Sequence, residues 1–241
     1  MPLSSTVSIP VVQRHPGPPL GMVAIAFTVL FCAGLYPVTA FGGKPYFPGP
    51  WESAQTIASF FRLRPTAAQL CAFLQFGSAV PLGIFTATIV SRLRFLGIKA
   101  AGVYIALFGG FGAAFAVASC ATVIWTMSHS GVAEDTTLTQ ALYFLSYGLG
   151  GPGYSVPLGL LMAGISVPLL LYRLVPRWIP ILGLALAACG ELSWLNLEFP
   201  STVLLIPLTR FPGFVWMIAV GFALPATTKR ATAVSVQAAA S

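Results

Sequence analysis

Two charged residues, Glu191 and Arg210, lie at the two ends of the largely apolar stretch GELSWLNLEFPSTVLLIPLTR. An unpaired charge at the middle of a bilayer costs about 2.5–3.5 kcal/mol on insertion scales. Pairing with an opposite charge and with further hydrogen-bonding groups relieves much of this cost. A carboxylate and a guanidinium in such a setting therefore indicate either a buried ion pair or a binding site for a polar ligand.

The elements that carry these residues decide whether they can meet. If one helix crosses outwards through Glu191 and the next returns through Arg210, both residues lie about 12–15 Å below the outer boundary, at 1.5 Å per residue. Consecutive antiparallel helices joined by a short turn are usually neighbours. We therefore expect the two charges to meet. Candidate hydrogen-bonding partners are Gln75, Tyr147, Ser193 and Asn196.

Three interpretations of this candidate polar site stay open. The pair could be a structural clamp that fixes the register of two helices. Glu191 could instead bind a cation, a proton or a polar ligand, with Arg210 tuning its charge. If the last helix begins only near Phe211, Arg210 is an ordinary anchor at the lipid headgroups.

Composition assigns the chain to the integral membrane proteins. Of its 241 residues, 57% are hydrophobic and only 7% are charged, with a mean hydropathy of +0.88, whereas soluble domains carry roughly 25% charged residues. The net charge of +7 does not indicate nucleic-acid binding, because no basic run with interleaved aromatic residues occurs. The four cysteines lie singly within apolar runs, which is typical of small buried side chains. We expect the lipid bilayer to be the main partner.

Apolar runs predict an all-α polytopic bundle with six transmembrane helices and short interfacial helices. The predicted spans are residues 20–41, 65–90, 100–127, 154–174, 179–197 and 201–224. Together, residues 20–225 form the transmembrane domain, between flexible tails at residues 1–19 and 226–241.

The apolar region 138–174 is too long for one span, since about 37 residues would extend roughly 55 Å across a core of about 30 Å. The sequence GLGGPG predicts a helix break, formed by Gly150, Gly151, Pro152 and Gly153. Such a break could be a plain loop after an interfacial helix at 138–148. It could also expose backbone groups that bind ions, as broken transporter helices do.

Aromatic and basic residues at the ends of the apolar runs predict anchors at the membrane interface. They are Trp51, Arg62, Arg64, Arg173, Arg177 and Trp178. The segment from Trp51 to Leu63 has the pattern of a short amphipathic helix. This helix could be an interfacial anchor or a lid over a cavity.

The distribution of basic residues predicts the orientation. With a cytoplasmic N-terminus, eight of the 12 basic residues lie on the inner side and four on the outer side. The inner set is Arg14, Arg92, Arg94, Lys99, Arg173, Arg177, Lys229 and Arg230, and the outer set is Lys44, Arg62, Arg64 and Arg210. The positive-inside rule then places both termini in the cytoplasm, and we expect the protein in the inner (plasma) membrane.

No motif in the sequence indicates a catalytic, cofactor or metal site. The two histidines are far apart, and H-E-x-x-H, G-x-S-x-G, a P-loop and a glycine fingerprint are all absent. His129 with Glu134 and Asp135 could form a weak metal site, but such residues are more often a solvated loop. We therefore expect no cofactor and no enzymatic activity.

Two stretches, SYGLGGPGYSVPLGLLMAGISVP and IPLTRFPGFVWMIAVGFALP, resemble an uncharacterised bacterial family of six-span membrane proteins. The resemblance implies a six-helix fold and supplies no site residues. We expect an accessory or scaffold protein that packs with itself or with another membrane protein through small residues such as Gly183, Ala187 and Gly190. The alternative is a transporter or ligand-binding membrane protein that uses Glu191 and Arg210. A lipid-modifying membrane enzyme is the third hypothesis.

Overall fold

The structure, a computed structural model, describes the backbone of residues 6–235 and the side chains of residues 12–228. The helices are α1 (Leu20–Leu35), α2 (Ala54–Leu63), α3 (Pro65–Phe95), α4 (Gly102–Met127), α5 (Ser130–Ala133), α6 (Thr136–Gly150), α7 (Pro152–Tyr172), α8 (Trp178–Leu192) and α9 (Leu205–Ala223). Short 3-10 turns follow α1 as η1 (Tyr36–Val38) and η2 (Ala40–Gly42), and join α8 to α9 as η3 (Ser193–Leu197) and η4 (Pro200–Leu204). Two strands, β1 (Thr6–Arg14) and β2 (Thr227–Ser235), come before the first helix and after the last helix in the sequence.

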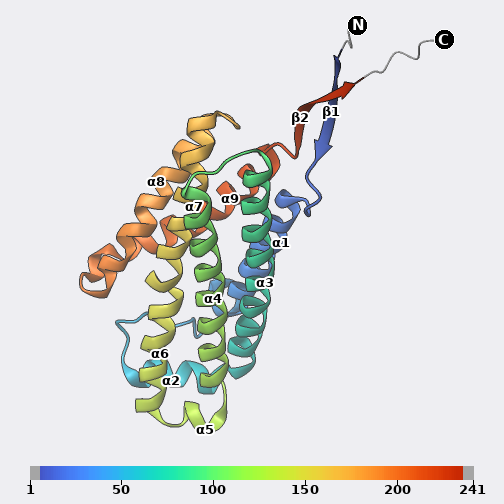
Figure 1. Cartoon of the computed structure of the whole chain (residues 1–241). Helices are drawn as coiled ribbons and strands as arrows, with labels where there is room; N and C mark the ends of the chain where they lie inside the picture. The colour runs from blue at the N-terminus through green and yellow to red at the C-terminus, as the bar shows by residue number, and fades with distance from the viewer. Residues whose placement is uncertain (1–5, 236–241) are drawn as a thin grey trace, which may run out of the picture.

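Within the described residues, six helical segments are long and apolar enough to cross a membrane, so the all-α six-span bundle is confirmed. These segments are Leu20–Val38, Pro65–Phe95, Gly102–Met127, Thr136–Tyr172, Trp178–Leu197 and Pro200–Ala223. In Figure 1, α3, α4 and the column of α6 and α7 run side by side, and α8 and α9 lie beside α7. Large apolar side chains remain exposed along these helices, as lipid-facing surfaces require.

Two separate clusters of buried apolar side chains divide the bundle along its length. The larger cluster joins α1, α3, α4, α7, α8 and α9. The smaller joins η1, α2, α5 and the adjoining ends of α3, α4 and α6, and we call these elements the cap. The cap lies at the end of the bundle opposite the two chain termini (Figure 1). Ile57, Phe60 and Phe61 of α2 are fully buried there, so α2 is part of a packed layer and not merely an interfacial anchor.

Small residues let α4 approach α7 closely. A Cβ atom added at Gly109 would lie 2.5 Å from the backbone nitrogen of Leu161 and 2.5 Å from the carbonyl oxygen of Pro157. One added at Gly164 of α7 would lie 2.4 Å from the carbonyl oxygen of Gly102. All three distances are far below van der Waals contact, so these helices pack backbone against backbone, as in other membrane bundles.

Within the two segments predicted as tails, β1 and β2 form an antiparallel ribbon in which Thr6 pairs with Ser235 and Arg14 with Thr227, and residues 1–5 and 236–241 of these tails lie outside the described residues. Two physical reasons explain the ribbon. Both segments are rich in β-branched residues, which favour extended backbone, and α1 packs against α9, which brings the two segments together. His15, at the end of β1, is buried at 6% exposure, and its Nε2 lies 3.0 Å from Ser91 Oγ on α3.

We predict that Gly109→Val destabilises the bundle by about 1–3 kcal/mol, because the added methyl groups overpack the contact with α7. Gly77→Ala on α3 is the matched control, since a Cβ at Gly77 meets nothing within 4 Å. This control should leave stability unchanged or raise it by up to about 1 kcal/mol, through better helix propensity. Thermal unfolding in detergent measures both variants, and equal midpoints would contradict the close α4–α7 packing.

A second prediction concerns His15, whose pKa is lowered by burial and, to a smaller degree, by the charge of Arg92. The backbone N–H of Gly17 donates to Nδ1 of His15 at 3.0 Å, so the neutral ring is the form that fits. A lowered histidine pKa gives stability that is complete above the unfolded value near 6.5 and is lost as the pH falls towards the folded value. The protection factor of the Gly17 amide, which is the factor by which its exchange is slower than the intrinsic rate at the same pH, should therefore fall as the pH drops from about 7.5 to 5.5, and His15→Gln should remove that fall. A constant protection factor over this range in the wild-type protein would count against this anchor.

Candidate functional site

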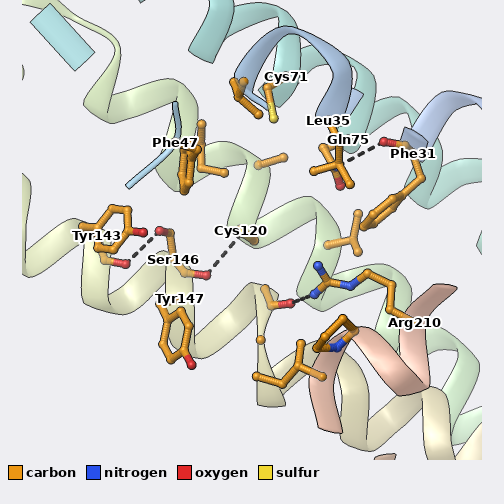
Figure 2. Close-up of a pocket in the computed structure, with 18 of the residues that line it drawn as sticks. Phe31, Leu35, Phe47, Cys71, Gln75, Cys120, Tyr143, Ser146, Tyr147 and Arg210 are labelled. Carbon is orange, nitrogen blue, oxygen red and sulfur yellow. Dashed lines mark hydrogen bonds between the residues drawn. The ribbon is translucent and has the colours of Figure 1, made fainter. Parts of the chain in front are cut away.

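A cavity of about 260 Å³ lies where the larger cluster meets the cap (Figure 2). Its walls come from α1 and η1, the loop before α2, α3, α4, α6, η4 and α9. Most of the lining is apolar, and the polar side chains on it are Gln75, Tyr143, Ser146, Tyr147 and Arg210. A mainly apolar cavity with a few convergent polar groups is the usual form of a small-molecule site.

Arg210 of α9 brings the charge to this cavity. Its Nη2 donates a hydrogen bond to the carbonyl oxygen of Gly150 (Figure 2). Its guanidinium carbon lies 5.5 Å from the ring centroid of Phe31 and 5.2 Å from that of Tyr154. Cation–π contacts of this kind contribute about 0.5–2 kcal/mol each, the larger values where water is excluded. The Nε of Arg210 is buried and has no hydrogen-bond partner.

The helix break supplies the carbonyl group that Arg210 uses. The structure narrows the predicted break to Gly151 alone, because α6 continues to Gly150 and α7 begins at Pro152. The backbone N–H groups of Tyr154 and Ser155 donate to Gly151 O, at 3.2 and 3.0 Å. The carbonyl of Gly150 therefore lacks its usual helical donor and accepts from Arg210 instead. The plain loop, one of the two interpretations from sequence, does not occur.

The other polar groups of the cavity are already engaged. Gln75 Nε2 donates to Phe31 O at 3.2 Å, which ties α3 to α1. The Tyr143 hydroxyl donates to Pro48 O. The Tyr147 hydroxyl donates to Oδ1 of Asn196 and so ties α6 to η3 beside the cavity. Of the predicted polar residues, Arg210 and Gln75 thus line the cavity. Asn196 does not line it but accepts a hydrogen bond from Tyr147, which does.

Glu191 is the exception, and the expected ion pair is not formed. Among the side chains that the structure describes, no hydrogen bond or ion pair joins Glu191 to Arg210. The backbones do meet at one level, since a Cβ added at Gly190 would lie 3.0 Å from Thr209 Cγ2. The side chains then diverge. Glu191 Oε1 faces α7, 3.0 Å from the position of a Cβ at Gly159, and it is buried without a partner.

Five of the six predicted anchors are exposed, namely Trp51, Arg62, Arg173, Arg177 and Trp178. Arg64 differs, because it is half-buried and its guanidinium donates to the carbonyl oxygens of Gly42, Gly43 and Pro45. Arg64 thereby holds the loop that carries Phe47 against the cavity. Arg64 lies between α2 and α3, one short helix after the Gly- and Pro-rich loop, and the free carbonyl groups expected in such a loop are the signal that favours this role.

Sequence reasoning missed the aromatic platform of Phe31 and Tyr154. Tyr154 is fully buried, and its ring stacks on Phe31 at 5.9 Å between centroids. One signal was available, because Tyr154 directly follows the GLGGPG break, about one helical turn after Gly150. Cys71 and Cys120 also line the cavity as free thiols. The described residues contain no group of three or more potential metal ligands.

No family model, curated protein or solved structure matches this chain. The resemblance to an uncharacterised bacterial family therefore stays a prediction, and the assignment of function rests on the geometry of the cavity.

We predict that Tyr147→Phe loosens the wall of the cavity, because it removes the bond between α6 and η3. The net value of such a bond is about 0.5–1.5 kcal/mol, which corresponds to an about 2- to 12-fold increase in opening. The rate at which a membrane-permeant maleimide labels Cys120, in a variant with the other three cysteines replaced by serine, measures this change. Tyr172→Phe is the control, since Tyr172 is exposed. Equal labelling rates in both variants would show that the bond does not hold the wall.

Proposed function

We propose that the protein is a non-enzymatic, ligand-binding protein of the inner membrane, and that its cavity takes one small amphipathic molecule. The observation that supports this most is the cavity itself, which combines apolar walls with a single charged side chain, Arg210. An apolar ligand body fits the walls, and a polar end fits the guanidinium. Glu191 has no part in this proposal, because it lines neither the cavity nor the path to it.

The use of small residues argues against the scaffold hypothesis. The helix contacts expected for a scaffold would place Gly183, Ala187 and Gly190 against a partner. All three are buried within the bundle. A Cβ at Gly183 would lie 2.1 Å from Ser166 Oγ, and one at Gly190 would lie 2.8 Å from Ser155 O. These faces are thus occupied by α7 of the same chain, which leaves ligand binding as the better supported function.

We further propose that both termini lie in the cytoplasm. Arg94 and Lys99 lie at or just after the end of α3, and Arg173 and Arg177 lie between α7 and α8. Both connections are at the end of the bundle that carries the termini (Figure 1), where positively charged loops are expected. The cap then lies on the outer side, and the cavity lies at the level of the outer leaflet.

Lateral entry from that leaflet fits the packing. α6 packs against α4 and α2, whereas α9 packs against α1 and α8. Tyr147 of α6 and Val203 and Pro207 on the η4–α9 segment line the cavity from both chain segments and are only half-buried. A ligand dissolved in the bilayer would enter between these two segments.

Filling the cavity tests this proposal. Ala121 is buried at 1% exposure on the cavity wall, so Ala121→Phe should occupy the space and cut ligand binding at least about tenfold. The probe is dodecanol that carries a photoreactive diazirine, cross-linked to the protein in phosphatidylcholine nanodiscs and mapped by mass spectrometry. Ala87→Phe on α3 is the control, because Ala87 is exposed.

We expect cavity-lining peptides to be labelled in the wild-type protein and in Ala87→Phe, and not in Ala121→Phe. Equal labelling in Ala121→Phe, or labelling spread evenly over the lipid-facing helices, would contradict a binding cavity.

A further inference from the structure

We infer that the ligand is a single-chain amphiphile with an oxyanion headgroup, a carboxylate or a phosphate monoester, which Arg210 binds. This inference rests on the proposed function and adds the chemical class of the ligand.

No acidic side chain described in the structure balances the positive charge of Arg210. The chain has only five acidic residues. Four of them, Glu52, Glu134, Asp135 and Glu198, are exposed in segments outside the cavity, and Glu191 faces α7. Among the described side chains, none forms an ion pair with Arg210. A guanidinium within the bundle without a counter-charge is costly, and an anionic ligand in the cavity would remove that cost.

The guanidinium of Arg210 also has N–H donors that no group of the protein uses. A guanidinium has five N–H groups in a planar fork. Arg210 uses one nitrogen, for Gly150 O, and its Nε is buried without a partner. A carboxylate or a phosphate can accept two parallel hydrogen bonds from such a fork. The aromatic faces of Phe31 and Tyr154 lie beside the guanidinium and hold its plane.

Arg210 is also the only charged side chain among the residues that line the cavity, and the neutral donors there are at least partly engaged. Gln75 Nε2 and the hydroxyls of Tyr143 and Tyr147 already donate within the protein. An uncharged alcohol would therefore find few free donors apart from Arg210. Arg92, the other arginine with an unpartnered Nε, does not line this cavity and donates to Pro18 O and Leu224 O at the opposite end of the bundle.

The size of the cavity favours a ligand with one chain. A cavity of about 260 Å³ has room for several water-sized groups. This space accommodates an oxyanion headgroup and the first few carbons of a chain, and the rest of the chain would extend between α6 and α9 into the bilayer. A phospholipid would have to keep its glycerol and both chains outside this space, so a single chain is the better fit.

The experiment compares three probes of equal chain length in zwitterionic phosphatidylcholine nanodiscs that contain the full chain. They are diazirine-labelled dodecanoate, dodecyl phosphate and dodecanol, each titrated at constant salt and followed by cross-linking to cavity peptides. We expect at least one of the two anions to bind the wild-type protein about tenfold or more tightly than dodecanol. The preferred anion then identifies the source as a fatty acid or as a phosphate monoester.

Variants of Arg210 test whether its guanidinium causes the preference for the anionic probes over dodecanol. Arg210→Gln should lower anion affinity to the level of dodecanol and leave dodecanol affinity unchanged within about twofold. Arg210→Lys keeps the charge but loses the fork, so its anion affinity should be intermediate. Arg62→Gln is the matched control, because Arg62 is exposed on α2 of the cap and its loss removes the same charge.

The outcomes separate this inference from the proposed function. Dodecanol binding in the cavity as tightly as both anions would overturn the oxyanion headgroup and leave the binding cavity intact. Equal losses in Arg210→Gln and Arg62→Gln would overturn the role of Arg210. Failure of all three probes to label the cavity would overturn the proposed function as well. If Arg210→Gln does not fold, the wild-type comparison and Arg210→Lys still decide.

Discussion

A guanidinium inside the bundle, with a buried Nε and no carboxylate partner among the described residues, is the constraint on which the centre of this protein depends. Arg210 is held by one carbonyl group, that of Gly150, and by the faces of Phe31 and Tyr154. Each of these groups is available for a structural reason. The break at Gly151 frees the carbonyl, and the close packing of α1 and α9 brings Phe31 to the same place. The helix break, the aromatic pair and the cavity thus all lie next to Arg210, and the first two stabilise its charge within the bundle.

The cap supplies one wall of the cavity beside Arg210. Without α2 and the loop held by Arg64, the cavity would lose the wall that carries Phe47. The smaller apolar cluster therefore does more than cover the ends of three helices. It forms part of the apolar wall of the cavity next to Arg210, and the attraction between a guanidinium and an anion is stronger beside an apolar wall than in open water. The fold thereby combines an apolar bundle with a single charged side chain on the wall of its cavity.

Much of the fold could be predicted from the sequence, because lipid imposes long apolar helices, and the starts at Leu20 and Pro65 followed directly from composition. The depth that Gly190 and Thr209 share along neighbouring helices could also be predicted by counting residues. The direction in which each side chain points could not be predicted in this way. Successive helical residues differ by about 100° around the axis, so a small error in helix rotation turns Glu191 from α9 to α7. The β1–β2 ribbon was missed because pairing between residues so far apart leaves no local pattern.

Arg210 is stabilised by the carbonyl of Gly150 and by two aromatic rings, and in our proposal by a ligand, but not by Glu191. A double-mutant cycle of Glu191→Gln and Arg210→Gln, read as free energy of unfolding in detergent without added amphiphile, measures whether the two charges interact. We expect additive effects, with a coupling energy below about 0.5 kcal/mol. A coupling energy above about 1.5 kcal/mol would show that Glu191 is the partner of Arg210 after all.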